Sequence, residues 1–63
     1  MDKKKYNMGG KLYDMFDDWS EAFDYCREGD VPVRVVIKED DIYELWVLFP
    51  SGQAEFIRGV QNG

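Results

Sequence analysis

Histidine is absent from this chain of 63 residues, and cysteine occurs once, as Cys26. Without histidine, the chain lacks the side chain that most often acts as a general acid or base near neutral pH. One thiol can neither close a disulfide within the chain nor build a structural zinc site. We therefore expect a protein that is not an enzyme and that uses no metal or cofactor, with no catalytic residue to assign.

Long apolar runs are missing as well. No segment approaches the roughly 20 residues that a transmembrane helix requires, and no apolar signal-peptide core follows the N-terminal lysines. A lone thiol in a chain without an export signal is typical of a reducing compartment. These features predict a cytoplasmic protein without a membrane partner.

The shortness of the chain limits its core. A chain of this size buries only about 60% of the surface that its unfolded form exposes. Disulfides and metals, which often compensate in small domains, are excluded by the composition. Ten aromatic residues are present, so dense aromatic packing or a binding partner is the expected source of stability.

The formal net charge of −5 is distributed unevenly. Residues 1–11 hold four lysines and one aspartate, a formal charge of +3, whereas residues 12–63 hold twelve acidic and four basic residues, a charge of −8. An acidic body repels nucleic acid and anionic lipid, and it attracts basic protein surfaces. The expected partner is a protein with a basic surface or a second copy of the chain, and direct nucleic-acid binding is not expected.

Residues 12–28 show the clearest periodicity. Apolar residues recur at steps of three and four, the spacing of one helical face, and acidic residues follow the same steps on the opposite face. Gly29 is a suitable C-terminal stop, and Pro32 prevents continuation of the helix. The pattern predicts an amphipathic helix that carries a row of partner-binding carboxylates: Asp14, Asp17, Asp18, Glu21, Asp24 and Glu28.

After Gly29 the apolar period changes to two. β-branched and aromatic residues over 31–38, 42–49 and 54–60 predict three strands. Residues 1–10 lack apolar periodicity and end in two glycines, so we interpret them as a flexible basic leader. The predicted fold is α+β, with one helix packed on a three-stranded antiparallel β-meander in the order α-β-β-β, and residues 11–63 form a single domain.

Turn chemistry suggests how these strands pair. The sequence "FPSGQ" favours a three-residue hairpin loop with Gly52 in the left-handed region. No glycine marks the preceding hairpin, and a loop with an odd number of residues is predicted there because a two-residue loop would place Ile37 opposite Glu44. The predicted pairs are Ile37–Tyr43, Val35–Leu45, Leu48–Ala54, Trp46–Phe56, Leu45–Ile57 and Glu44–Arg58.

These registers give the sheet two different faces. One helix covers only one face of a three-stranded sheet, so the helix is expected on the face with Val35, Ile37 and Leu45. The second face is predicted to stay open unless the leader folds across it. Aromatic residues beside arginine are usual interface centres, so this face is interpreted as a partner or dimer interface with the residues Arg34, Trp46, Leu48, Phe56 and Arg58.

Helix stability does not explain the acidic row, because each like-charged pair three or four residues apart costs roughly 0.2–0.5 kcal/mol. Either the charge keeps the protein in solution, or the carboxylates recognise a basic groove and take the place of phosphates.

The leading hypothesis is a small acidic protein-binding module that regulates or inhibits a basic partner, for example a nucleic-acid-binding protein. Small size and acidity are also common among accessory proteins encoded by phages and mobile elements. One alternative is a structural homodimer or complex subunit assembled through the open sheet face, with acids that only solubilise. The other is weak nucleic-acid binding through Lys3, Lys4, Lys5 and the sheet aromatics.

Overall fold

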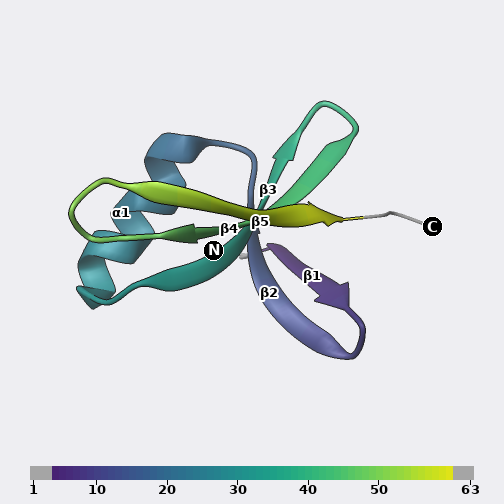
Figure 1. Ribbon diagram of the computed structural model, residues 1–63, viewed down its shortest axis with the longest axis horizontal. Coiled ribbons are helices and arrows are strands. Elements are labelled where there is room, and N and C mark those ends of the chain that lie inside the picture. Colours follow the sequence, from purple (N-terminus) through teal and green to yellow (C-terminus); the bar gives the residue numbers. More distant parts are fainter. Residues whose placement is uncertain (1–3, 61–63) are drawn as a thin grey trace.

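The computed structural model of the chain describes residues 4–60 and folds them into one five-stranded sheet with one helix (Figure 1). The strands lie in the sheet in the same order as in the chain. Strands β2 and β3 are parallel, and the helix connects them, whereas the other neighbours are antiparallel. The elements are β1 (Lys4–Met8), β2 (Lys11–Phe16), α1 (Trp19–Gly29), β3 (Val33–Glu39), β4 (Ile42–Leu48) and β5 (Ala54–Val60).

This architecture corrects the predicted fold. The three-stranded meander in the order α-β-β-β is wrong, because the sheet is mixed, has five strands and follows the order β-β-α-β-β-β. Residues 12–16, expected in the first half of a long helix, belong to β2, and residues 4–8 of the expected leader form β1. The first three residues of that leader lie outside the described residues.

The β1–β2 hairpin turns at Gly9 and Gly10, whose φ angles are 60° and 89°. A two-residue loop with positive φ at both positions matches the right-handed twist of hairpin strands, and glycine adopts it without steric cost. The Asn7 side chain accepts a hydrogen bond of 3.0 Å from the Gly10 backbone N–H. These contacts make the glycine pair a hairpin turn and not the end of a flexible segment.

Helix α1 begins later than predicted because Asp18 caps it. The Asp18 backbone is extended, and its side chain accepts a hydrogen bond of 2.8 Å from the Ser20 N–H. Capping by aspartate satisfies backbone donors that have no partner inside the helix. At the other end, Gly29 is the last helical residue, and Asp30 in the left-handed region bonds back to the Cys26 and Arg27 carbonyls.

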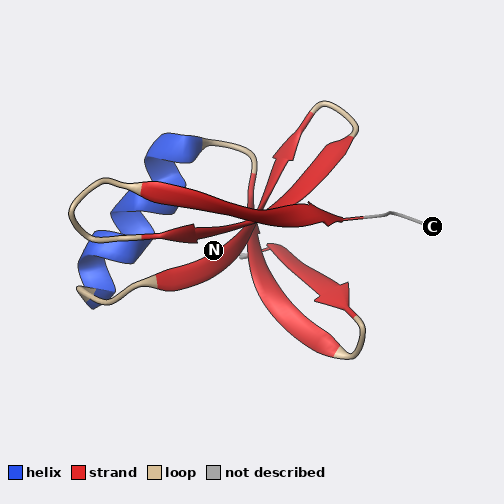
Figure 2. Cartoon of the chain, viewed as in Figure 1, coloured by secondary structure: helices blue, strands red, loops and turns tan. Residues whose placement is uncertain are grey.

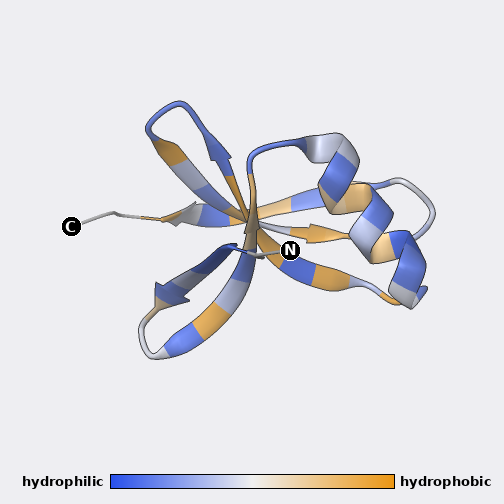
Figure 3. Cartoon of the chain, turned by 180° about the vertical axis from the view of Figure 1, so that it is seen from behind, coloured by the Kyte–Doolittle hydropathy of each residue, from blue (hydrophilic) through white to orange (hydrophobic). Residues whose placement is uncertain are grey.

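Helix α1 lies against one face of the sheet (Figure 2), and the main core lies between them. Hydrophilic and apolar positions alternate around the helix (Figure 3), and its apolar side packs on β2, β3 and β4. The Cys26 sulfur is fully buried and lies 3.4 Å from the carbonyl oxygens of Val31 and Leu48. The buried cluster consists of Ala22, Cys26, Val35, Ile37 and Leu48.

The β3–β4 hairpin has a two-residue loop, which corrects the predicted odd-numbered loop. Glu39 pairs with Ile42, and Val35 therefore lies opposite Trp46. Asp40, the first loop residue, has a φ of 55°. Because side chains alternate along a strand, a shift of one residue moves every β4 side chain to the other face.

The β4–β5 hairpin confirms the pairs nearest its loop. Trp46 pairs with Phe56, Leu48 pairs with Ala54, and Gly52 has a φ of 101°. A bulge then shifts the register by one residue, so that Leu45 pairs with Arg58 and Glu44 with Gly59. The predicted pairs Leu45–Ile57 and Glu44–Arg58 are therefore wrong.

The sheet face away from the helix is covered by the first hairpin. Val36 and Leu45 are buried there although no helix lies over them. The Tyr6 and Tyr43 rings lie 5.2 Å apart, and the Arg58 Nη2 group donates to the Met8 sulfur at 2.9 Å. These contacts join β1 to β4 and β5 although β1 pairs only with β2 in the sheet, so the sheet curls and β1 folds over its second face.

Within residues 4–60, no helix has the length and apolar character needed to cross a membrane.

Candidate acidic groove

A groove of about 480 Å³ lies beside α1 where the helix meets β1, β2 and β3. We call it the acidic groove, because five carboxylates and two lysines line it, a formal charge of −3. Five of the six predicted partner-binding acids lie on it, and they come from β2, the segment before the helix and the helix itself. Its lining residues are Lys4, Asp14, Met15, Phe16, Asp17, Glu21, Asp24, Tyr25, Glu28 and Lys38.

Apolar side chains of β2 and α1 form part of the groove wall. Phe16, at the end of β2, contacts Tyr25 of α1 with 5.5 Å between the ring centroids. Met15 precedes Phe16 and pairs with Val36 in the parallel ladder. The groove therefore combines apolar surface with charge, a composition that suits a side chain with an aliphatic stem and a cationic head.

Asp14 is the most enclosed acid of the groove. Its side chain is 12% exposed and accepts a hydrogen bond of 2.6 Å from the Lys5 ammonium group on the paired strand. A hydrogen bond with Asp14 raises the pKa of Tyr25, and burial and the negative charge of Asp14 raise it further. Asp14 thus links the first hairpin to α1 and fixes the position of the groove wall.

Four acids form the exposed rim of the groove. Asp17 precedes the helix, and Glu21, Asp24 and Glu28 follow along successive turns of α1. The structure gives this rim one ion pair among residues 4–60, a 3.5 Å contact between Asp24 and Arg27 on exposed side chains. An exposed ion pair is weak and easily exchanged, and it engages one of the four rim acids. Most of the rim charge is therefore available to a ligand.

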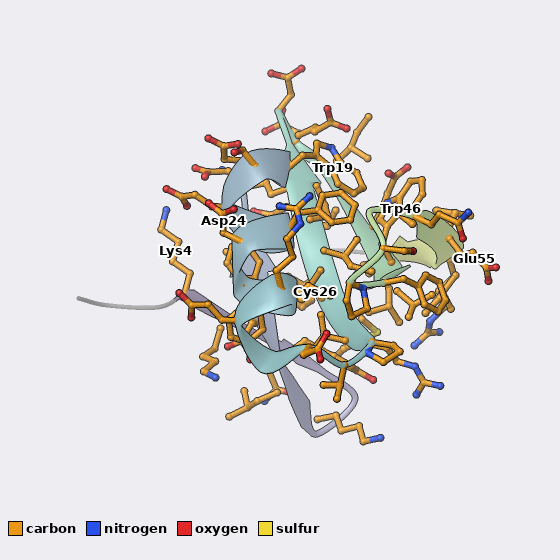
Figure 4. All side chains as sticks on the ribbon, turned by 90° about the vertical axis from the view of Figure 1, so that its left-hand side faces the viewer. Lys4, Trp19, Asp24, Cys26, Trp46 and Glu55 are labelled. Carbon is orange, nitrogen blue, oxygen red and sulfur yellow. The ribbon has the colours of Figure 1, made fainter. Side chains whose placement is uncertain are left out.

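The two lysines that line the groove come from the sheet. Figure 4 shows Lys4 and Asp24 on the same side of the molecule. Lys38 lies 6.0 Å from the centre of the Tyr43 ring. Neither lysine was predicted to lie near the acids: Lys4 was expected in the flexible leader, and Lys38 was expected on the sheet face away from the helix.

The sixth predicted acid, Asp18, has a different role because it caps the helix. The row of carboxylates was expected on one continuous helix from Asp14 to Glu28, and this expectation is wrong. The described part of the chain contains no group of three acidic or cysteine side chains arranged to hold a metal ion.

The predicted sheet-face interface is not assembled as expected. Leu48 is fully buried under the helix, and Trp46 is half-buried between Trp19 and Phe56. The register places Arg34 and Arg58 on the other face of the sheet. Of the five predicted residues, only Trp46 and Phe56 lie together on the surface.

Sequence reasoning missed the groove residues Met15, Phe16 and Tyr25. Met15 and Phe16 were placed on the apolar face of a helix, and Tyr25 falls between its acidic and apolar faces. The signal that could have found the groove is the Gly9-Gly10 pair, because it predicts a hairpin and therefore a strand over residues 11–16.

Comparison of the chain with known proteins found no matching family model, no matching curated sequence and no matching solved structure.

Proposed function

We propose that this protein is a small binding module that regulates or inhibits a partner protein by holding a basic segment of it in the acidic groove. The observation that carries the proposal is the convergence of acids from three parts of the chain on one groove that also has apolar walls. A rigid sheet and helix hold these groups before the partner arrives, which reduces the entropy lost on binding.

The groove offers two contributions to binding. Carboxylates on the rim attract a positively charged partner from a distance and accelerate the encounter. Phe16, Met15 and Tyr25 then receive the aliphatic stems of lysine or arginine side chains. The volume of about 480 Å³ accommodates one or two such side chains and not a folded element, so we propose an extended or exposed basic segment.

A nucleic-acid-binding protein is the partner class that we favour. Such proteins carry basic surfaces built for phosphate groups, and rim carboxylates can occupy them in place of phosphates. We include a cytoplasmic location in the proposal, because Cys26 is a free thiol and such thiols are typical of reducing compartments.

The two other functions considered from the sequence have less support. A homodimer through an open sheet face relied on Leu48 beside Trp46, and Leu48 is buried by the helix. Nucleic-acid binding relied on free lysines, and Lys5 is paired with Asp14 while Lys4 lines the acidic groove.

Affinity capture followed by kinetics tests the proposal. The immobilised protein is compared in a cell lysate with the triple variant Asp17→Asn, Glu21→Gln and Asp24→Asn, and captured proteins are identified by mass spectrometry. For a captured partner, we expect the association rate to fall about tenfold in the variant and about tenfold between low and high salt, as for steered association.

The control variant changes charge by the same amount away from the groove. It carries Asp30→Asn, Asp41→Asn and Glu55→Gln, three exposed acids that do not line the acidic groove. A partner that binds wild type and both variants equally, with no dependence on salt, would show that the acids only solubilise the protein.

A further inference from the structure

Trp46 and Phe56 form an exposed corner at the outer margin of the helix-covered face. Helix α1 packs on β2, β3 and β4, and β5 lies beyond them at the edge of the sheet. Phe56 is 53% exposed. Figure 4 shows Trp19 and Trp46 near each other on this side of the molecule.

The aromatic rings of the corner are held at steep angles to one another. The Trp46 ring lies 5.0 Å from Trp19 at 85° and 5.4 Å from Phe56 at 71°. Edge-to-face packing of this kind fixes the rings, and the exposure of Phe56 leaves ring surface accessible at the corner. Ring faces carry negative electrostatic potential, and they attract cations within about 6 Å.

A carboxylate completes the corner. The Trp46 Nε1–H group donates a 3.1 Å hydrogen bond to Glu44 Oε1, which fixes the carboxylate beside the rings. No lysine or arginine among residues 4–60 forms an ion pair with Glu44. Gly59 lies opposite Glu44 on β5, and a side-chain carbon placed at Gly59 would meet no atom within 4 Å, so the neighbouring strand leaves open space at the position paired with Glu44.

We propose that the corner formed by Glu44, Trp46 and Phe56 binds an arginine side chain of the partner protein. The guanidinium group is planar, so it can stack on an aromatic ring while it donates to a carboxylate. Charge complementarity selects this occupant, because the corner offers ring faces and an unpaired negative charge together. The inference rests on the proposed function only in taking the partner to be basic, and the corner is separate from the acidic groove.

Nuclear magnetic resonance provides the test. The two tryptophans give two indole N–H signals, and substitution of Trp46 by phenylalanine assigns them. Titration with N-acetyl-arginine methylamide is expected to shift the Trp46 signal saturably, because the same indole donates to Glu44. The citrulline analogue has the same shape without the charge and is expected to cause little shift.

Two variants locate the contact. Glu44→Gln keeps an acceptor for Trp46 and removes the charge, and we expect it to weaken binding about threefold, the effect of one exposed ion pair. Phe56→Ala is expected to weaken binding by a similar factor by removing a ring face. Glu55→Gln, on the opposite face of β5, is the matched control and should leave the titration unchanged.

Several outcomes would overturn the inference. Equal shifts with the citrulline or a leucine derivative would show an apolar docking surface, and shifts that depend on protein concentration alone would show a second copy of the chain. An unchanged titration in Glu44→Gln would exclude the carboxylate. The triple groove variant separates the two proposals: it should titrate normally here even if partner capture through the acidic groove fails.

Discussion

Asp14 on β2 and Tyr25 on α1 are joined by a side-chain hydrogen bond, and this bond raises the pKa of Tyr25. The same carboxylate accepts a 2.6 Å hydrogen bond from Lys5 on β1. One acid therefore connects the first hairpin to the helix. This connection matters for the groove, because the parallel ladder between β2 and β3 contains only the pairs Met15–Val36 and Phe16–Ile37.

Replacement of Tyr25 by phenylalanine is expected to cost about 1 kcal/mol of stability at neutral pH, the value of one hydrogen bond. The raised pKa also predicts the pH dependence. The folded state holds the tyrosine proton more tightly than the unfolded state, whose value is about 10. The contribution is therefore complete below about pH 10 and is lost as pH rises through the raised pKa.

Ultraviolet absorbance of tyrosinate measures the effect directly. The part of the tyrosinate absorbance that is lost in the Tyr25→Phe variant belongs to Tyr25, and it should appear at a pH above the usual tyrosine pKa of about 10. Tyr13→Phe serves as the control on the same hairpin. If the absorbance change lost in Tyr25→Phe has its midpoint at or below the usual tyrosine pKa, the hydrogen bond with Asp14 is contradicted.

The second half of the predicted helix over residues 12–28 is helical in the structure, and the first half is not. Over residues 19–28, apolar steps of three and four coincide with the observed helix, and Trp19, Ala22 and Cys26 pack on the sheet as that pattern requires. Over residues 11–16, short apolar runs fit both a strand and a helix. The cap at Asp18 decides between them, and aspartate is too common among these residues to mark the boundary by itself.

The sheet faces were mispredicted because of a single hairpin. An aliphatic residue opposite an acid is an unfavourable pair, yet Ile37 lies opposite Glu44, and the Glu44 carboxylate finds its partner along its own strand by accepting the Trp46 indole hydrogen bond. Pair preferences assume that each residue interacts mainly across the strands. A hydrogen bond between residues two apart on one strand lies outside that assumption.

Glycine substitutions in the loop test this hairpin. Only the first of its two residues, Asp40, has positive φ, and glycine is preferred at such a position. Asp40→Gly is expected to stabilise the protein by about 0.5 kcal/mol in urea unfolding. Asp41→Gly is the matched control and should destabilise by about 0.5–1 kcal/mol. Equal losses at both positions would contradict the two-residue loop.

Two apolar residues on the helix-covered face, Leu48 of β4 and Phe56 of β5, differ greatly in burial. Leu48 is fully buried and Phe56 is 53% exposed. Leu48→Ala should therefore cost about 3 kcal/mol, whereas Phe56→Ala should cost roughly 1 kcal/mol. Chemical denaturation measures both, and Leu48→Val gives a smaller change if the alanine variant does not fold. Similar small losses of stability in Leu48→Ala and Phe56→Ala would contradict the burial of Leu48 and would place both residues on an open sheet face.

The acids of the candidate site were identified from the sequence, but their arrangement was not. The spacing of the acids is visible in the order of the residues, whereas the groove forms only when β2 and α1 lie side by side. That contact depends on the parallel crossover between β2 and β3, which joins residues about 20 positions apart. No local pattern in residues 12–28 encodes such a pairing.

Tyr6 tests whether the first hairpin is part of the fold. Its ring contacts Tyr43 at 5.2 Å, on the sheet face where Val36 and Leu45 are buried without a helix. Tyr6→Ala should uncover this second core, with an expected loss of about 1–2 kcal/mol in urea unfolding and increased binding of a hydrophobic dye.

Leu12→Ala is the matched control for Tyr6→Ala, because Leu12 is an apolar residue of the same hairpin and is 65% exposed. Exposed substitutions usually change stability by less than about 0.5 kcal/mol, so this variant should unfold like wild type. If Tyr6→Ala also unfolds like wild type, β1 contributes no stability. The hairpin would then not fix the groove wall, because Lys5 and Asp14 connect β1 to that wall. Binding in the groove would in that case depend on α1 and on the part of β2 that pairs with β3.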